Sequence, residues 1–172
     1  DDRFVQAVVP AIAATTPDIA LSTAPADLVA SFLRINGDLR RQNDDTIAGH
    51  AGATSPEMLW RGAFQALGNA SVEAGFADNR TYFYQGKEID RQVHLGFDLA
   101  VTERIPILAA NAGVVLHAAD LGIYGNCVIV DHGLGVQSLY AHLSSIDVNA
   151  GDRVEQGHVL GRSGMTGLAG GD

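Results

Sequence analysis

The chain has 172 residues, 47% hydrophobic and 18% charged, which is enough apolar material to fold around a core as one or two domains. The net charge of −9, with only 11 scattered basic residues, argues against a nucleic-acid-binding protein and against a basic membrane-surface helix. The single cysteine, Cys127, excludes both a disulfide within the chain and a cysteine-based zinc knuckle.

The first part of the chain is rich in Ala and Leu. Residues 1–24 predict extended or loop structure with at most one short helix, and their apolar stretch is too short to span a membrane. The chain starts without an initiator Met, which favours a processed N-terminus. Residues 26–43 predict a helix, because apolar side chains recur there at helical spacing: Leu28, Phe32, Ile35 and Leu39.

A second helix is predicted from Ser55 to about Gly68. Ser55 is a good N-cap, and the following proline and acidic residue suit a first helical turn. Its apolar stripe includes Trp60 and Phe64, which we expect to pack in the core.

The chain changes character near residue 80, where short β-branched runs begin to alternate with Gly and Asp turns. Strands are predicted at 81–84, 88–93, 96–101, 107–110, 113–118, 126–131 and 136–143, with turns at 85–87 and 132–135 and a series of turns over 148–161. The prediction is therefore an α+β protein, with a helical region at 1–74 followed by a mainly antiparallel β domain at 75–172.

His94 and Asp98 are the first candidates for chemistry. On a strand, residues four apart point to the same side, and no polar side chain lies between these two. An imidazole nitrogen and a carboxylate oxygen there could both reach a zinc ion at roughly 2.0–2.2 Å. The spacing by itself is weak evidence for a metal site.

His142 lies near the end of the strand predicted at 136–143, where a side chain can face solvent. Strand alternation predicts that Tyr140 and Ser144 project to the same side as His142. A buried histidine bonded to the backbone is the structural alternative. His132 is expected to stabilise a turn, and Cys127 to be a small core residue.

Several ordered motifs carry a resemblance to a known family. They are Gly75-Phe76 with Arg80, His94-Leu95-Gly96-Phe97-Asp98, Pro106 with Ala109 and Gly113-Val114, Tyr124-Gly125-Asn126, Asp131-His132-Gly133, Tyr140-Ala141-His142-Leu143-Ser144, Gly151-Asp152 with Val154 and Gly157, and Gly164 with Thr166-Gly167. In this order they resemble the lysostaphin/LytM-type zinc metalloendopeptidases, which hydrolyse bacterial peptidoglycan. The similarity runs from Phe76 to Gly167, somewhat over half of the chain.

The resemblance implies a lysostaphin-type fold, built on a duplicated hybrid motif, and a single Zn²⁺ held by His94 and Asp98. It implies hydrolysis of peptide cross-links or stem peptides by a zinc-activated water, with His142 as general base or oxyanion stabiliser. Tyr84 and Arg80 are candidates for binding substrate. An enzyme of this kind is expected to be exported to the periplasm or cell envelope.

One element of the family is not found in the sequence. The family places a His-x-His pair shortly after the Thr-Gly element, and the second His is the third zinc ligand. That pair would fall directly after Asp172, so we expect a peptidase domain truncated at its C-terminus, and the activity of the chain as given stays open.

Parts of the sequence suggest two other function classes. A non-catalytic wall-binding or amidase-activating module on the same fold is the alternative, because the ligand set is incomplete. The turns at 151–161 also resemble biotinyl and lipoyl carrier domains. Those need a modifiable lysine at a hairpin, and Lys87, the only lysine, lies far from that stretch.

Overall fold

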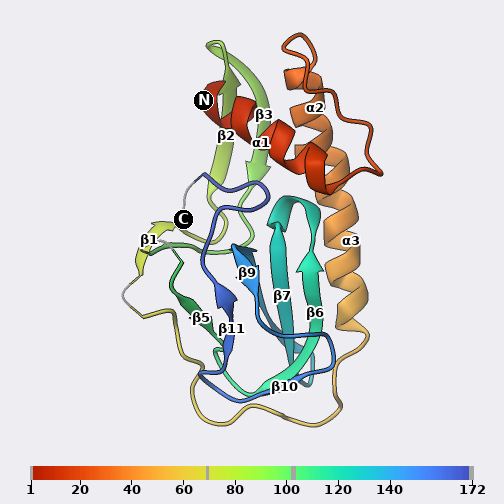
Figure 1. Cartoon of the computed structure of the whole chain (residues 1–172). Coiled ribbons are helices and arrows are strands. Elements are labelled where there is room, and N and C mark those ends of the chain that lie inside the picture. Colours follow the sequence, from red (N-terminus) through yellow and green to blue (C-terminus); the bar gives the residue numbers. More distant parts are fainter. Residues whose placement is uncertain (1, 69, 102–103, 171–172) are drawn as a thin grey trace.

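The computed structural model describes residues 2–68, 70–101 and 104–170, in which helices come first and antiparallel strands follow (Figure 1). The helices are α1 (Asp2–Thr15), α2 (Leu28–Arg34) and α3 (Arg40–Ala51), with a π-helical segment, Ile35–Leu39, between α2 and α3. The helix predicted over 26–43 is confirmed, and it continues to Ala51. None of the described helices is long and apolar enough to cross a membrane.

Residues 1–24 were predicted to be extended or loop with at most one short helix, and the structure has there the 14-residue helix α1. Its side chains at helical spacing, Val5, Val8, Val9 and Ile12, are all buried. Pro10 lies inside the helix. Burial of this apolar face therefore outweighs the cost of an interior proline, which is about 3 kcal/mol.

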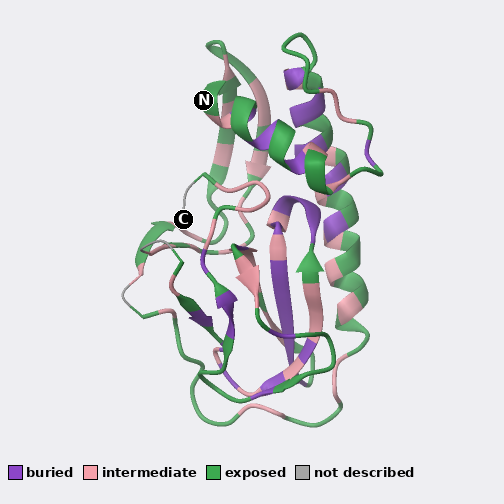
Figure 2. Cartoon of the chain, viewed as in Figure 1, coloured by how far each residue is buried: buried purple, intermediate pink, exposed green. Residues whose placement is uncertain are grey.

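The helices enclose a first core centred on Phe32, which has no exposed surface. Its ring contacts Phe4 of α1 at 6.2 Å between centroids and Tyr82 of strand β2 (Asn79–Tyr84) at 5.3 Å. The side chain thus joins α1, α2 and β2 in one cluster. Figure 2 shows buried stretches on both helices.

Phe32→Ala is expected to destabilise the protein by about 3–5 kcal/mol, because it opens a cavity among rings that cannot fully collapse. Urea unfolding followed by circular dichroism measures this change. Leu33→Ala, the adjacent position with a 39% exposed side chain, is the control and should cost under about 1 kcal/mol. Equal losses in both variants would contradict a core centred on Phe32.

In the part of the chain that the structure describes, four groups of paired strands follow. Strand β2 forms a hairpin with β3 (Lys87–Val93), and β1 (Ser71–Ala74) pairs with β4 (Asp98–Ala100). A four-stranded sheet has the order β10 (Arg153–Val154), β6 (Gly113–Asp120), β7 (Asn126–Gly133) and β8 (Val136–Leu143). A three-stranded sheet has the order β5 (Pro106–Leu108), β11 (Val159–Arg162) and β9 (Ser145–Ile146). All pairs are antiparallel, as predicted.

The two larger sheets share a second core. Val128 and Val130 of β7 and Leu160 of β11 are fully buried there, next to Val115 of β6 and Leu143 of β8. Strand β7 is buried along nearly its whole length (Figure 2). One face of the strand packs in this second core, and Ile47 of α3 packs on the side chains of the opposite face. The four-stranded sheet is therefore a rigid platform, and β8 carries His142 on it.

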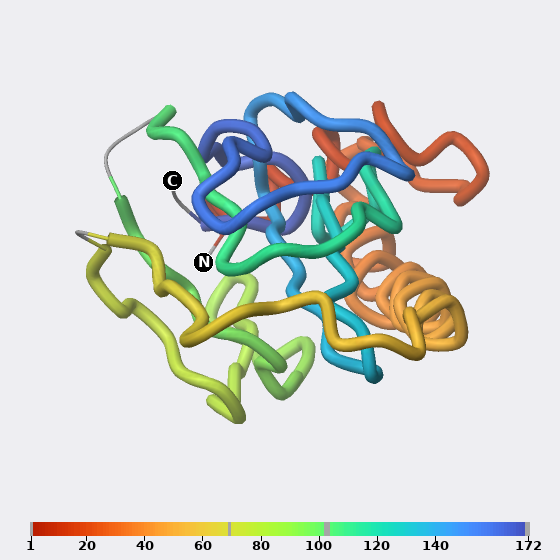
Figure 3. The backbone as a smooth tube through the Cα atoms, turned by 90° about the horizontal axis from the view of Figure 1, so that it is seen from below, coloured from red at the N-terminus to blue at the C-terminus, as the bar shows by residue number. Residues whose placement is uncertain are grey.

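The helix predicted from Ser55 to Gly68 is wrong. Residues 54–65, here called the strap, run without helix or strand across one end of the sheets, from α3 toward β1 (Figures 1 and 3). Three buried or partly buried groups bind its backbone. Asp131 accepts from Ser55 N at 2.8 Å, Asn111 accepts from Arg61 N at 3.0 Å, and His132 O accepts from Leu59 N at 2.8 Å.

The apolar residues of the strap also differ from the prediction. Trp60 is half-buried and Phe64 is 41% exposed, so neither is a core residue. Phe64 packs edge-on against the buried ring of His132, 4.8 Å between centroids. The helix-start signals of the strap are local, and long-range backbone bonds to the sheets outweigh them.

Candidate metal centre and catalytic site

His94 and Asp98 converge, but a loop rather than a strand brings them together. His94 follows β3 and Asp98 begins β4, so the strand predicted over 96–101 starts two residues late. The loop places His94 Nε2 3.1 Å from Asp98 Oδ1. The side chain of His94 is 15% exposed and that of Asp98 42%, so the pair lies at the edge of the fold, open on one side.

A backbone carbonyl orients His94. Gly75 O lies 3.0 Å from His94 Nδ1, and a carbonyl can only accept, so Nδ1 carries the proton. The lone pair of Nε2 is then directed toward Asp98. A metal-binding histidine is typically held in this way by its other ring nitrogen.

Arg80 orients Asp98. Its Nη2 donates to Asp98 Oδ2, while Asp98 Oδ1 faces His94. The carboxylate therefore has one oxygen held by the guanidinium and the other directed at the histidine. The sequence proposed Arg80 as a substrate-binding residue, and the structure places it directly on the candidate metal ligand.

His142 is aimed by a β-bulge. Between the pairs Tyr140↔Val128 and Leu143↔Asn126, strand β8 holds one residue more than β7. His142 has a φ of +59°, a left-handed conformation uncommon outside glycine. Bulges re-aim single side chains and are frequent beside active sites.

The bulge breaks the alternation expected from the sequence, under which Tyr140, His142 and Ser144 project alike. Tyr140 OH accepts from Ala110 N at 2.7 Å, within the body of the sheets. Ser144 Oγ donates to Ser163 O at 2.6 Å. His142 Nδ1 instead lies 2.7 Å from Thr166 O, on the loop after β11. The three side chains therefore have three different partners.

The pKa of His142 lies below its ordinary value. Burial lowers it most, while the Thr166 carbonyl and the charge of Asp98 act to raise it, and Arg80 and His94 lower it. The imidazole is consequently neutral at pH 7. Thr166 O takes the proton of Nδ1, so Nε2 is free of a proton and able to accept one.

The loop that orients His142 is fixed by close packing. Thr166 Oγ1 donates to Leu143 O and accepts from Asn126 N, both at 2.9 Å. Gly167 has a φ of +73°, and a Cβ there would lie 2.4 Å from Gly125 N. Two motifs that are 40 residues apart thus meet at the bulge, and only a glycine fits between them.

The structure brings four of the five sequence candidates together. The charges of Arg80, His94 and Asp98 all act on the ring of His142, so the four side chains share one region. Tyr84 is not part of it. It lies at the turn end of the β2–β3 hairpin and packs on the helical core. Sequence reasoning missed the two orienting carbonyls, Gly75 and Thr166, although both residues lie within the motifs that it used.

The residues fit a zinc ion in kind. An imidazole nitrogen and a carboxylate oxygen are two of the usual donors of a zinc site with open positions. Here each side chain is oriented by a hydrogen bond at its other polar atom, as metal ligands usually are. Within the described ranges, no group of three or more His, Cys, Asp or Glu residues is placed to hold a metal. The site therefore supplies two ligands.

Cys127 is buried in the core, as expected, whereas His132 lies within β7 and not in the turn predicted there. His132 is fully buried, with Nδ1 2.7 Å from Ala112 O and Nε2 2.8 Å from Ser138 Oγ. Burial raises the pKa of the Cys127 thiol to about 12, so this residue is not a nucleophile.

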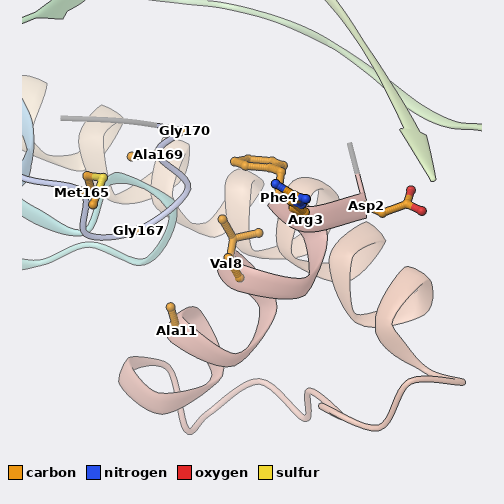
Figure 4. Close-up of a pocket in the computed structure, with 10 residues that line it drawn as sticks. Asp2, Arg3, Phe4, Val8, Ala11, Met165, Gly167, Ala169 and Gly170 are labelled. Atoms are coloured by element: carbon orange, nitrogen blue, oxygen red, sulfur yellow. The ribbon is translucent and has the colours of Figure 1, made fainter. Parts of the chain in front are cut away.

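Two clefts lie near the site. One, of about 740 Å³, separates α1 from residues 165–170, which follow β11 and include the carbonyl that orients His142 (Figure 4). Phe4, Val8 and Met165 give it a mainly apolar lining. The other, of about 470 Å³, lies between α3 and the β2–β3 hairpin and includes Arg80.

Comparison with known proteins shows which family this region is similar to. Residues 92–172 match the model of Peptidase family M23. The DD-carboxypeptidase/endopeptidase Mpg of Neisseria meningitidis is 40% identical over 76 residues, which are 44% of this chain and 17% of that protein. The peptidoglycan DD-endopeptidase ShyA of Vibrio cholerae is 36% identical over 74 residues, 43% of this chain and 17% of that protein. The chain thus spans only a small part of the length of these relatives.

Two solved structures share the fold. The catalytic domain of the antimicrobial peptidase lysostaphin from Staphylococcus simulans is 27% identical, with a TM-score of 0.51 over 60% of this chain and 74% of that one. A zinc-containing peptidase from Vibrio cholerae is 25% identical, with a TM-score of 0.52 over 62% of this chain and 33% of that one. The lysostaphin-type fold expected from the sequence is confirmed.

Proposed function

Since residues 92–172 of this chain belong to peptidase family M23, we propose that the protein is a zinc-dependent endopeptidase that cuts peptides of bacterial peptidoglycan. Relatives that share this region include a protein named as a peptidoglycan DD-endopeptidase and one named as a DD-carboxypeptidase/endopeptidase. The observation that supports the proposal best is the convergence of His94 Nε2 and Asp98 Oδ1. The other polar atom of each side chain is hydrogen-bonded to a separate partner.

In the proposed site, His94 and Asp98 would hold the zinc ion, and the described residues supply these two ligands. A bound zinc would polarise the scissile carbonyl and acidify a water molecule. Arg80 keeps Asp98 from turning away from the metal. Gly75 fixes the tautomer of His94 that leaves Nε2 available.

His142 is proposed to handle the proton. Its imidazole is neutral, and the bond to Thr166 O fixes the tautomer with a bare Nε2. It can therefore take a proton from the attacking water and return it to the leaving amine, a role worth about 10²–10⁴-fold in rate. Once protonated, it can also stabilise the oxyanion.

The domain boundary and location are part of the same proposal. We place the peptidase domain at 75–172 and the helical region at 1–74, with β1 (Ser71–Ala74) reaching across the boundary to pair with β4. A protein that acts on peptidoglycan is placed in the periplasm or cell envelope.

The test is metal analysis and muropeptide analysis of the protein, including any residues that its gene encodes after Asp172. We expect one zinc per chain, and mass spectrometry should show new peptide termini in digested peptidoglycan that a chelator abolishes. Stoichiometric zinc without cleavage, or wall binding without zinc, would favour the non-catalytic wall-binding module instead.

A further inference from the structure

The cleft between α3 and the β2–β3 hairpin has an unusual charge. Three of the 11 basic residues of the chain line it, Arg40, Arg80 and Arg91, against one acidic residue, Asp44. The chain as a whole carries −9. Arg80 and Arg91 already pair with carboxylates, Asp98 and Glu88, which shows that guanidinium groups at this cleft bind carboxylates.

We propose that this cleft binds a free carboxylate of the peptide substrate next to the candidate metal centre. The proposal rests on the proposed function for its substrate and adds the feature of that substrate which is recognised. Arginine suits such a role, because its planar guanidinium matches a carboxylate with two parallel hydrogen bonds.

The hairpin is fixed against the helices, so the cleft has rigid walls. Asn36, fully buried in the π-helical segment, donates to Asp90 Oδ2 at 2.7 Å and accepts from Gln92 Nε2 at 3.1 Å through its carbonyl. Gln92 is the strand partner of Arg80. Arg40 donates twice to Asn36, which sets the plane of its guanidinium.

Arg91 can exchange its present partner for a ligand. It pairs with Glu88, three residues away, and its side chain is 73% exposed. Surface pairs of this kind contribute little to stability, so a substrate carboxylate can compete for the guanidinium at small cost. Arg91 is therefore the best position for a substitution. Arg40 and Arg80 also bind Asn36 and Asp98, so their replacement would disturb the structure as well.

The cleft includes the two neighbours of His94 in the sequence. Val93 and Leu95 line it and are 46% and 65% exposed. They stand on either side of His94 in the sequence. A peptide could place its free carboxylate on the arginines and its small apolar side chains against Val93 and Leu95. Its neighbouring peptide bonds would then lie near His94 and Asp98. Peptides that combine alanine methyl groups with free carboxylates, as wall stem peptides do, match this lining.

The experiment compares two forms of a synthetic stem peptide, one with free carboxyl groups and one with all of them amidated. Calorimetry with a peptide whose scissile bonds are reduced gives the Kd, and cleavage of the ordinary peptide by the zinc-loaded protein gives kcat and KM. We expect the free form to bind about tenfold more tightly, and Arg91→Gln to reduce that preference to about threefold or less.

Arg41→Gln is the matched control. Arg41 is 72% exposed and pairs with Asp38, also three residues away, but it does not line the cleft. It should keep the full preference for the free form. Equal affinity of the wild-type protein for both peptides, or equal loss in the two variants, overturns the proposal. If the free peptide binds with the expected preference but is not cleaved, the result supports carboxylate binding in the cleft and counts against the proposed function. A failure of the cleft proposal is thus distinguishable from a failure of the proposed function.

Discussion

His94→Ala is expected to lose the bound zinc and at least about 10³-fold in cleavage rate. The substitution removes one of the two proposed zinc ligands, and with it several kcal/mol of the electrostatic stabilisation that the metal would give the transition state. Atomic absorption on dialysed protein measures the metal, and release of peptide termini from peptidoglycan measures the rate.

The control for this variant is His158→Ala, which removes an exposed histidine remote in sequence from the cluster. It should keep one zinc per chain and the wild-type rate. Circular dichroism must show that both variants are folded, which we expect because His94 lies in a loop and contributes to none of the buried clusters. A His94→Ala protein that keeps stoichiometric zinc would contradict the assignment.

His142→Asn is the second large effect. It should keep the zinc and lower kcat by about 10²–10⁴-fold, the usual contribution of a general acid–base. Asparagine is chosen because it tolerates the left-handed backbone at this position better than alanine does. The asparagine side chain cannot accept and return a proton, so KM should change less than kcat.

His158→Asn is the matched substitution for this test, and it should leave kcat unchanged. A loss of less than about tenfold in His142→Asn, with zinc retained and the protein folded, would assign His142 to structure rather than to catalysis. Loss of zinc in this variant would make it a ligand instead, since it shares a region with Asp98 and His94.

The strands were predictable because their signals are local. Alternation of apolar residues and the glycine turns indicated β2, β3, β6, β7 and β8 to within a few residues. The strap was not predictable. Its Ser55-Pro56-Glu57 start is a good local helix signal, and what cancels it is a set of backbone bonds to Asn111 and Asp131, far along the chain.

The candidate site, too, was only partly predictable from the sequence. His94 and Asp98 were found from their spacing within an ordered set of motifs, yet the reason given for their convergence, a shared strand, was wrong. The loop between β3 and β4 brings them together. Arg80 was assigned to substrate, and its bond to Asp98 became visible only in the tertiary structure, which brings this residue of β2 to the first residue of β4.

The sequence by itself determined that helices precede strands, the family resemblance and the identity of the residues that could carry chemistry. Residue type and short-range periodicity encode these directly. Only the tertiary structure decided how each group is aimed. The bulge at His142, the carbonyls of Gly75 and Thr166 and the guanidinium on Asp98 depend on contacts between segments up to 24 residues apart. Such contacts leave no periodic signal, because any backbone carbonyl at the right place in space can make them.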